Sequence, residues 1–410
     1  MKDTFVFLRT GVSGGTGTLS IRLSESLIKK GYEVLYICQE INDINNAENL
    51  KKLGVKIHKW KESKISNNLI QIYGSRKRYI FMTYSLNEFL LVESMKKYIH
   101  INNSILYVVH QYGLTKGYGV SNWLKPMLAI FYKRLVKKIL NSERVIFMDD
   151  FIPSFTKKYY NLECNNMRSL IINLPMVVKK FDSNSVDNKL KLNIFNLLTI
   201  SRAEFPFKGY LIGLIKEYNK LCEIYNDIEL TIITFGQDVE RINKEVNSLS
   251  REVKEKIHVY GQTSYSKLMN YFNKSHLYIG MGSTILDAAN HSTPSLIVSQ
   301  YTYDCFTSGF FHMQPNLLVA KENSYEGINT YIENVKNMGQ KAYKELCIRE
   351  YRTLSKNYNM NSFFDYLERD NSKSSDMLFS KYELTTYRVF SVIGQCVKLV
   401  RKNAIKERNK

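Results

Sequence analysis

Short apolar runs alternate with longer amphipathic stretches along most of the chain. Apolar runs of about four to eight residues are typical of buried strands, and apolar residues that recur every three or four positions are typical of helices. A regular alternation of the two predicts an α/β fold, with parallel sheets covered by helices. Helical periodicity is clear over residues 17–30 and 122–140. The strand candidates are residues 4–9, 33–38, 56–60, 79–82, 105–110, 144–148, 170–172, 195–200, 230–235, 257–260, 277–279 and 295–298.

With 410 residues, the chain exceeds the size of about 250–300 residues at which a single hydrophobic core usually divides. Residues 179–193 lose the apolar rhythm and are rich in Lys, Asp, Asn and Ser, which indicates a connection. We predict a first Rossmann-like domain over residues 1–178, a linker over 179–193 and a second Rossmann-like domain over 194–358. A basic helical tail, residues 359–410, is expected to pack back on the first domain.

Composition indicates where in the cell the protein is located and which classes of partner it can bind. No apolar run reaches the roughly 20 residues of a membrane span, and the first apolar run leads into a glycine loop without the cleavage site of a signal peptide. The six cysteines are scattered, without the close pairs of a disulfide framework or zinc site. A cytoplasmic location is therefore expected. The formal net charge of +20 favours phosphates, nucleic acid or an acidic membrane surface as partners.

A glycine-rich loop, Thr10-Gly-Val-Ser-Gly-Gly-Thr-Gly17, follows the first strand candidate. Its small residues let the backbone approach a ligand, so Gly14, Gly15 and Thr16 are candidate ligand contacts. The same spacing occurs in short-chain dehydrogenases, which bind a dinucleotide at this loop. A plain strand-to-helix turn is a third interpretation.

The dehydrogenase interpretation also requires a Tyr-x-x-x-Lys pair. Tyr73 with Lys77 and Tyr112 with Lys116 both have this spacing. A chain with 29 tyrosines and many lysines produces such pairs by chance, however, and neither pair lies on a convincing helix. The pairs therefore keep this alternative open without favouring it.

Two cations follow the strand candidate at residues 195–200, in Arg202-Ala-Glu-Phe-Pro-Phe-Lys208. Arginine offers a fork of donors and lysine a compact charge, and both suit a diphosphate. Together they could stabilise the negative charge that builds on a departing nucleoside diphosphate. The alternative is two solvated loop charges.

Three further segments follow in order, Thr231-Ile-Ile-Thr-Phe-Gly236, Val259-Tyr-Gly-Gln262 and Tyr278-Ile-Gly-Met-Gly-Ser-Thr-Ile-Leu-Asp-Ala-Ala-Asn-His-Ser-Thr-Pro294. With the two cations, they resemble the carboxyl-terminal half of retaining GT-B glycosyltransferases, above all family four of that classification (glycosyl transferases group one). The resemblance covers residues 195–300 well. The glycine loop, His110 and residues 172–175 match more loosely.

The resemblance implies a GT-B fold, in which two Rossmann-like domains with parallel sheets face a central cleft. It implies transfer of a hexose-type sugar from a UDP or GDP donor with retention, without metal or another cofactor. The acceptor would be a lipid-linked saccharide or oligosaccharide held by the first domain. In this scheme Arg202 and Lys208 bind the diphosphate and act catalytically, and Asp287 binds the ribose. The other implied donor contacts are Gly14, Gly15, Thr16, Phe235, Gly236, Tyr260, Gly261, Gly280, Met281, Gly282, Ser283 and Thr284.

One motif departs from the family, which usually has two glutamates eight positions apart. Ile279 replaces the first and Asp287 the second. Because the first glutamate generally contacts sugar hydroxyls in that family, the sequence does not identify the donor sugar. An altered donor and an inactive relative are both consistent with this change.

His110 ends the strand candidate 105–110, where open α/β folds bind ligands. We expect it to contact the transferred sugar as a catalytic residue, and a structural histidine is the alternative. Asp149 and Asp150 also follow a strand candidate, but no Asp-x-Asp or His/Cys cluster indicates a metal. We interpret these two acids as a helix cap.

Basic segments at residues 124–138 and 397–410 suggest where the protein acts. The first carries five cations and no acid beside apolar residues that include Met127, Leu128 and Phe131. Such a helix can rest on anionic lipid, or it can pack in the core with a solvated basic face. We expect peripheral binding at the inner face of the plasma membrane, in capsule, O-antigen or exopolysaccharide synthesis. No nucleic-acid motif is present; the rival classes are an NAD(P)-dependent dehydrogenase and a non-catalytic binder of anionic surfaces.

Overall fold

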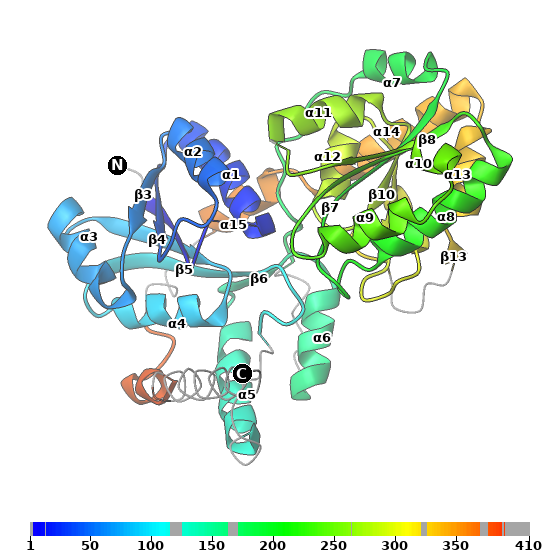
Figure 1. The fold of residues 1–410 in the computed structure, drawn as a ribbon. Coiled ribbons are helices and arrows are strands. Elements are labelled where there is room, and N and C mark those ends of the chain that lie inside the picture. The colour runs from blue at the N-terminus through cyan, green and yellow to red at the C-terminus, as the bar shows by residue number, and fades with distance from the viewer. Residues whose placement is uncertain are drawn as a thin grey trace. The chain divides into compact units, whose positions relative to one another are not determined.

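The computed structural model describes residues 3–12, 14–114, 125–162, 171–263, 265–320, 326–369, 376–387 and 389. The chain forms two compact units. Unit 1 combines Met1–Pro175 with Met360–Lys410, and unit 2 is Met176–Asn359. Each unit has one sheet with helices packed on it (Figure 1). The predicted α/β class with two parallel-sheet halves is confirmed.

The sheet of unit 1 has six strands in the order β3-β2-β1-β4-β5-β6, and all neighbours are parallel. The order reverses between β1 and β4, so the carboxyl ends of these two strands form the topological switch point at which such sheets bind ligands. The strands are β1 Thr4–Arg9, β2 Glu33–Cys38, β3 Lys56–Lys59, β4 Arg78–Thr83, β5 His100–Val108 and β6 Val145–Phe147.

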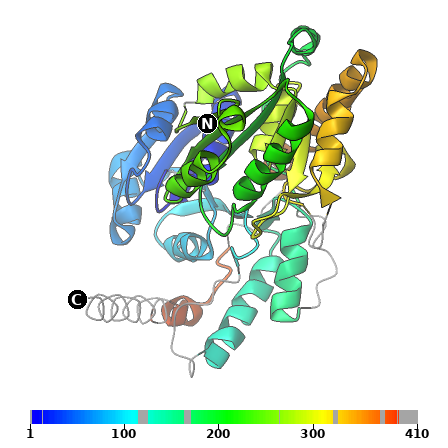
Figure 2. The same cartoon turned by 45° about the vertical axis from the view of Figure 1, so that its right-hand side comes forward.

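Helices cover both faces of this sheet (Figures 1 and 2). Side chains of β1 alternate between the faces: Val6 and Leu8 lie in a core cluster with Leu69. On the other face, Phe5 contacts Phe363 with ring centroids 6.4 Å apart. The helices before residue 175 are α1 Gly14–Lys29, α2 Ile44–Lys52, η1 Glu62–Lys64, α3 Ile65–Tyr73, α4 Leu86–Met95, α5 Lys125–Leu140 and α6 Phe151–Tyr160.

Several element ends in unit 1 differ from the prediction. α1 begins at Gly14 rather than at residue 17, where helical periodicity was expected to start. β5 ends at Val108, so His110 lies in the turn after the strand. Ile171 forms a single bridge with Phe147 where a strand was expected over residues 170–172.

The chain after unit 2 returns to unit 1. α15 (Asn361–Glu368) places Phe363 against β1, and Tyr366 donates a hydrogen bond to the Glu143 carbonyl at 3.0 Å. Further along, Phe379 and Leu384 join the core cluster that includes residues of α4, α5 and α6. The basic end of the predicted tail, residues 390–410, lies outside the described residues.

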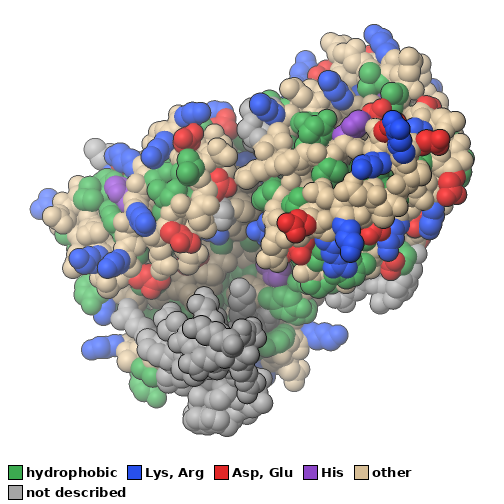
Figure 3. Space-filling view, in the orientation of Figure 1, with side chains coloured by type: hydrophobic (Ala, Val, Ile, Leu, Met, Phe, Trp, Pro, Cys, Tyr) green, Lys and Arg blue, Asp and Glu red, His purple; other side chains and the backbone are tan. Residues whose placement is uncertain are grey.

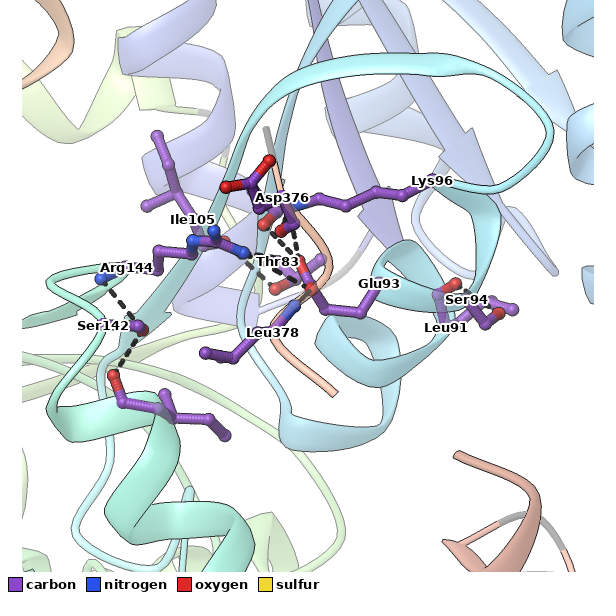
Figure 4. Close-up of polar contacts among 12 residues, drawn as sticks. Thr83, Leu91, Glu93, Ser94, Lys96, Ile105, Ser142, Arg144, Asp376 and Leu378 are labelled. Atoms are coloured by element: carbon purple, nitrogen blue, oxygen red, sulfur yellow. Dashed lines mark hydrogen bonds and ion pairs between the residues drawn. The ribbon is translucent and has the colours of Figure 1, made fainter. Parts of the chain in front are cut away.

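The buried carboxylate of Glu93 holds the segment after α15 on unit 1 (Figure 4). Glu93 of α4 pairs with Lys96 at 2.9 Å and with Arg144 at 3.3 Å, and all three side chains are at most 5% exposed. Glu93 also accepts a hydrogen bond from the backbone N–H of Leu378 at 2.9 Å, and Lys96 donates to the carbonyl of Asp376 at 3.0 Å. Burial lowers the pKa of Lys96 to about 8, although Glu93 opposes this shift.

The sheet of unit 2 has seven strands in the order β13-β12-β11-β10-β7-β8-β9. β12 and β13 run antiparallel at one edge, and the other neighbours are parallel. The order reverses between β7 and β10, which places a second switch point there. The strands are β7 Phe195–Arg202, β8 Ile228–Phe235, β9 Ile257–Tyr260, β10 Leu277–Gly280, β11 Ser295–Val298, β12 Phe306–Phe310 and β13 Glu326–Gly327.

The segment predicted as a linker, residues 179–193, contains a helix of unit 2. α7 is capped by Asp182, whose carboxylate accepts a hydrogen bond from the Ser185 N–H at 3.0 Å. Lys189 is fully buried and donates to the Thr293 hydroxyl at 2.6 Å. Polar residues here cap and anchor a helix, which the polar composition did not reveal. The helices of unit 2 are α7 Ser183–Leu190, α8 Tyr210–Ile224, α9 Val239–Asn247, α10 Arg251–Lys254, α11 Tyr265–Lys274, α12 Thr284–Asn290, η3 Phe311–Met313, α13 Asn329–Lys336 and α14 Gln340–Asn357.

The surface carries mixed charge. On the face shown in Figure 3, Lys and Arg side chains are spread over both units with Asp and Glu between them. Among the described side chains of this face, the cations do not form the single basic stripe that is typical of nucleic-acid binding. In the part of the chain that the structure describes, every helix is too short or too polar to span a bilayer.

Candidate active site

Two segments meet at the switch point of unit 2. β7 ends at Arg202 and β10 ends at Gly280, and the two strands are paired in parallel. The carboxyl ends of neighbouring parallel strands share one edge of a sheet, where ligands bind at a switch point. The loop that carries Lys208 and the turn before α12 are therefore brought to the same edge.

The loop after β7 is held close to the end of β8. Gly236 has a φ of +121°, and a Cβ at this position would lie 2.6 Å from the Ala203 carbonyl oxygen and 3.0 Å from Cγ of Arg202. Asp238 accepts a hydrogen bond from the backbone N–H of Phe205 at 2.7 Å. Glycine at 236 thus permits the close approach, and Asp238 fixes the path of the loop with the two cations.

The two cations differ in how their charge is balanced. Arg202 is half-exposed, and its Nη2 lies 2.6 Å from the Glu204 carboxylate. No described residue forms an ion pair with Lys208, whose Nζ lies 4.8 Å from the centre of the Phe207 ring. Burial and then the charge of Arg202 lower the pKa of Lys208 to about 7, although Glu204 raises it. A bound anion would move this pKa back towards its usual range.

The two glycines in the turn between β10 and α12 differ in the space around their Cα atoms. Gly282 has a φ of +80°, and a Cβ there would meet no atom within 4 Å. A Cβ on Gly280 would instead clash with the ring and hydroxyl of Tyr278, and Met281 is buried in the core of unit 2. Glycine at position 280 is therefore required by the packing of Tyr278, and the donor contact expected of Gly280 stays a prediction.

The start of α12 has two uncommitted amides. Thr284 shares a hydrogen bond between its hydroxyl and that of Tyr278 at 2.5 Å, so its side chain is held by the core. The Gly282 N–H donates to the Leu318 carbonyl at 2.6 Å, whereas the N–H groups of Ser283 and Thr284 have no acceptor among the described residues. Unpaired amides at the start of a helix are suited to bind a phosphate.

Asp287, the expected ribose ligand, lies in the first turn of α12 and is only 4% exposed. Its carboxylate is within electrostatic reach of His291, whose pKa falls to about 4 because burial and Lys179 outweigh the effect of Asp287. Ile279 is fully buried in the core cluster of unit 2. Core packing therefore accounts for an apolar residue where the resembling family carries a glutamate.

Two exposed rings follow the neighbouring strands. Phe235 at the end of β8 is 41% exposed, and Tyr260 at the end of β9 is 43% exposed. Phe235 is in register with Arg202, Tyr260 contacts the Tyr271 ring at 5.5 Å, and Gly261 has open space where a Cβ would lie. Exposed aromatic rings beside cations offer surfaces on which a nucleotide base can stack.

In unit 1, a carboxylate of the chain occupies the switch point. Glu88 accepts hydrogen bonds from the backbone N–H groups of Thr10 at 3.1 Å, Tyr84 at 3.2 Å and Ser85 at 3.1 Å. Burial raises the pKa of Glu88, and these hydrogen bonds oppose the shift. This carboxylate therefore joins the loop after β1 to the loop after β4. Gly14 and Gly15 remain open at the start of α1, with Thr16 partly exposed beside them.

Tyr73 and Lys77, the first of the two Tyr-x-x-x-Lys pairs, each bond to another residue of unit 1. The Tyr73 hydroxyl shares a hydrogen bond with Nε2 of His58 at 3.0 Å, and Lys77 pairs with Glu33 at 2.7 Å. Tyr73 and Lys77 thus each have a partner in the fold, and neither contacts the other in the described structure. In the second pair, Lys116 lies outside the described residues.

His110 is exposed in the turn after β5. Its Nδ1 accepts a hydrogen bond from the Tyr112 N–H at 3.2 Å. A neutral ring with this bond carries its proton on Nε2, which makes that nitrogen a donor suited to a sugar hydroxyl.

A metal centre is not apparent in the described part of the chain, where no group of three His, Cys, Asp or Glu side chains could hold an ion. Asp149 accepts a hydrogen bond from the Ile152 N–H at 2.9 Å, and burial raises its pKa to about 6. Asp150 precedes α6 without a side-chain capping bond. Only Asp149 therefore caps the helix with its side chain.

Sequence reasoning missed four residues that shape these sites, namely Glu204, Asp238, Tyr278 and Glu88. Glu88 had a signal, because Ser85 and Glu88 have the spacing of a capping box, which the structure contains. The reach of Glu88 to Thr10 depends on the pairing of β1 with β4, which no local pattern predicts.

No protein-family model and no curated protein sequence matches the chain, but solved structures do. A glycosyltransferase from Rickettsia africae is 14% identical, with a TM-score of 0.62 over 90% of this chain and 100% of that one. HepE of Anabaena, solved with UDP and glucose, is 11% identical, with a TM-score of 0.60 over 91% and 100%. Sucrose-phosphate synthase from Thermosynechococcus elongatus is 12% identical, with a TM-score of 0.58 over 89% and 98%. The chain has the GT-B fold. Identities this low show the GT-B architecture, and the chemistry has to be argued from the residues.

Proposed function

We propose that this GT-B chain is a glycosyltransferase that moves a hexose-type sugar from UDP or GDP to a saccharide acceptor with retention of configuration. Lys208 carries the proposal, because a lysine with a lowered pKa beside Arg202 gains most from a ligand with two adjacent phosphates. The neighbouring exposed rings of Phe235 and Tyr260 suit the base. The GT-B neighbour that was solved with UDP and glucose is consistent with this donor class.

In the proposed reaction, the bond between the anomeric carbon and the diphosphate oxygen breaks as the acceptor hydroxyl forms a bond to the same carbon. The acceptor proton passes to the leaving diphosphate, so no enzymic nucleophile is needed. Arg202 and Lys208 stabilise the charge on that leaving group. Asp287 binds the ribose, the amides of Ser283 and Thr284 meet a phosphate, and His110 donates to the transferred sugar.

The reaction is proposed to need no metal or other cofactor, because two cations supply the positive charge that a metal provides in other transferases. Turnover should then persist in EDTA. The acceptor is proposed to be a lipid-linked saccharide or oligosaccharide of a capsule, O-antigen or exopolysaccharide.

Such an acceptor would bring the protein to an anionic membrane surface. In the second half of α5, Leu135 and Val136 are buried in the core cluster of unit 1, so these two side chains are not available to a bilayer. Arg134 and Lys137 of the same helix are exposed. We therefore propose electrostatic contact through cations rather than insertion of an apolar helix face.

The test is release of nucleoside diphosphate from a panel of UDP and GDP sugars in the presence of oligosaccharide acceptors, with the anomeric configuration of the product read by NMR. Arg202→Ala and Lys208→Ala should each reduce kcat by about 10²–10³, as loss of one charge-stabilising donor does. Lys216→Ala is the matched control, because Lys216 is an exposed lysine of α8 outside the site. Normal turnover in both site variants, or an inverted product, would contradict the proposal.

A further inference from the structure

Aromatic rings form a row on unit 1 that begins beside His110 and follows α6. Phe151, Phe155 and Tyr159 recur every four residues, which places them on one face of the helix. Their ring centroids lie 6.0 Å apart for the first pair and 6.4 Å apart for the second. Tyr112 meets Phe155 edge-on at 5.3 Å and lies 5.5 Å from the His110 ring. Tyr112, Phe151, Phe155 and Tyr159 are called the aromatic row below.

The fold does not require rings at these positions. The opposite face of α6 packs the helix on unit 1, because Ile152 is 1% exposed and Tyr160 is 9% exposed in the core cluster. In the aromatic row, Tyr112 is 38% exposed and Tyr159 is 54% exposed, and the two phenylalanines are partly exposed. Large rings that are left in water beside a candidate site favour a binding role.

The aromatic row begins at the ligand-binding edge of the unit 1 sheet. β5 and β6 are parallel neighbours; His110 comes two residues after β5, and α6 begins four residues after β6. Because both strands end at the same edge, His110 and Phe151 start from that edge. α6 then continues beyond the end of β6 (Figure 1). A ligand that contacts His110 can therefore extend along the rings.

The chemistry of the aromatic row suits a sugar chain. A pyranose has flat faces of C–H bonds bordered by hydroxyl groups, so it stacks on a ring while its rim bonds to polar groups. The hydroxyls of Tyr112 and Tyr159 lie in the row itself, and Ser154, Lys157 and Lys158 are its partly or fully exposed helical neighbours. On the basis of the proposed function, we infer that the aromatic row binds the acceptor saccharide. The saccharide extends from His110 along the rings of α6.

Two other occupants fit less well. A lipid surface is usually contacted by a broad apolar helix face, whereas this row is bordered by the exposed polar residues Ser154 and Lys158. A stable protein interface takes in about 20–30 residues on each partner, whereas the row has four. Three of its rings follow one another along α6, as the sugars of an extended saccharide do.

The experiment measures binding of the labelled full-length protein to an array of tri- and tetrasaccharides of glucose, galactose, mannose, rhamnose and N-acetylglucosamine. Tyr159→Ala and Phe155→Leu should weaken binding to the recognised saccharides by about threefold to tenfold each, and Tyr159→Phe should lose much less. Tyr382→Ala is the control, because Tyr382 is a 78% exposed tyrosine of unit 1 outside the row.

Three results would overturn the inference: no saccharide of the array is bound, Tyr159→Ala binds as well as the parent protein, or Tyr159→Ala loses only its binding to phosphatidylglycerol vesicles. Stabilisation of the same samples by UDP or GDP in a melting experiment separates this inference from the proposed function. Nucleotide stabilisation without saccharide binding rejects the acceptor site alone. If no nucleoside diphosphate stabilises the parent protein, the donor assignment of the proposed function is rejected first.

Discussion

At the scale of single residues, burial and the charge of Arg202 lower the pKa of Lys208 to about 7. An anionic ligand favours the charged form, so donor binding should raise this pKa and take up a proton when the pH lies above 7. Affinity for UDP or GDP should therefore fall as the pH rises from 7 to 9, by at most tenfold for each pH unit. Calorimetry in buffers of different ionisation enthalpy measures the proton uptake. Lys208→Ala should remove it, and uptake that persists in this variant would assign the proton elsewhere.

The positions of some of these residues in the fold could be predicted from the sequence, and those of others could not. The positions of Arg202 and Lys208 followed from a strand that ends before a loop, because strand ends in parallel sheets face ligands. The burial of Gly280 under Tyr278 could not be foreseen, since a Gly-x-Gly pattern does not reveal which glycine faces the core. The contact of Glu88 with Thr10 was missed for another reason, because the two residues lie 78 positions apart in the sequence.

At the scale of elements, the attachment of the segment after α15 depends on Glu93 of α4. Replacement by Gln leaves the buried cations Lys96 and Arg144 without a carboxylate, which typically costs about 3–5 kcal/mol in the free energy of unfolding. This loss in the free energy of unfolding should appear in the urea-induced transition of unit 1. Hydrogen exchange of the Leu378 amide should also become faster. Glu25→Gln is the control, because Glu25 forms an exposed pair with Lys29 at 2.7 Å. Equal effects of the two substitutions would contradict the structural role of the network.

The ends of several strands were predicted correctly from the sequence. The strands at residues 4–9, 33–38, 257–260 and 295–298 have the expected ends. The prediction failed where polar residues form structure, as in α7, whose Lys189 is buried by hydrogen bonds rather than by apolarity. The antiparallel strands β12 and β13 were also missed, because each is short and pairs only at the sheet edge.

At the scale of the whole molecule, the net charge of +20 should produce binding to anionic vesicles that weakens with salt. Arg134→Glu with Lys137→Glu on α5 should weaken co-sedimentation with phosphatidylglycerol vesicles by about 1 kcal/mol or more for each cation. The matched control is Lys216→Glu with Lys254→Glu, which makes the same charge change on exposed residues of unit 2. An equal loss in both variants would indicate a general effect of charge and no role for α5.

The division into two parallel sheets was predictable, because alternating strands and helices leave few other arrangements for a chain of this length. The path of the chain after residue 359 needed tertiary information. Phe363 reaches β1 through contacts between residues more than 350 positions apart, and composition alone cannot encode such a pairing.

The central claim is that unit 2 binds a nucleoside diphosphate through Arg202 and Lys208. Calorimetric titration of the full chain with UDP, GDP, UMP, GMP and NAD(P) tests it most directly. We predict that one diphosphate binds at least tenfold more tightly than its monophosphate, and that this difference disappears in Lys208→Ala but persists in Lys216→Ala. Equal affinities for diphosphate and monophosphate, or binding of NAD(P) alone, would contradict the account.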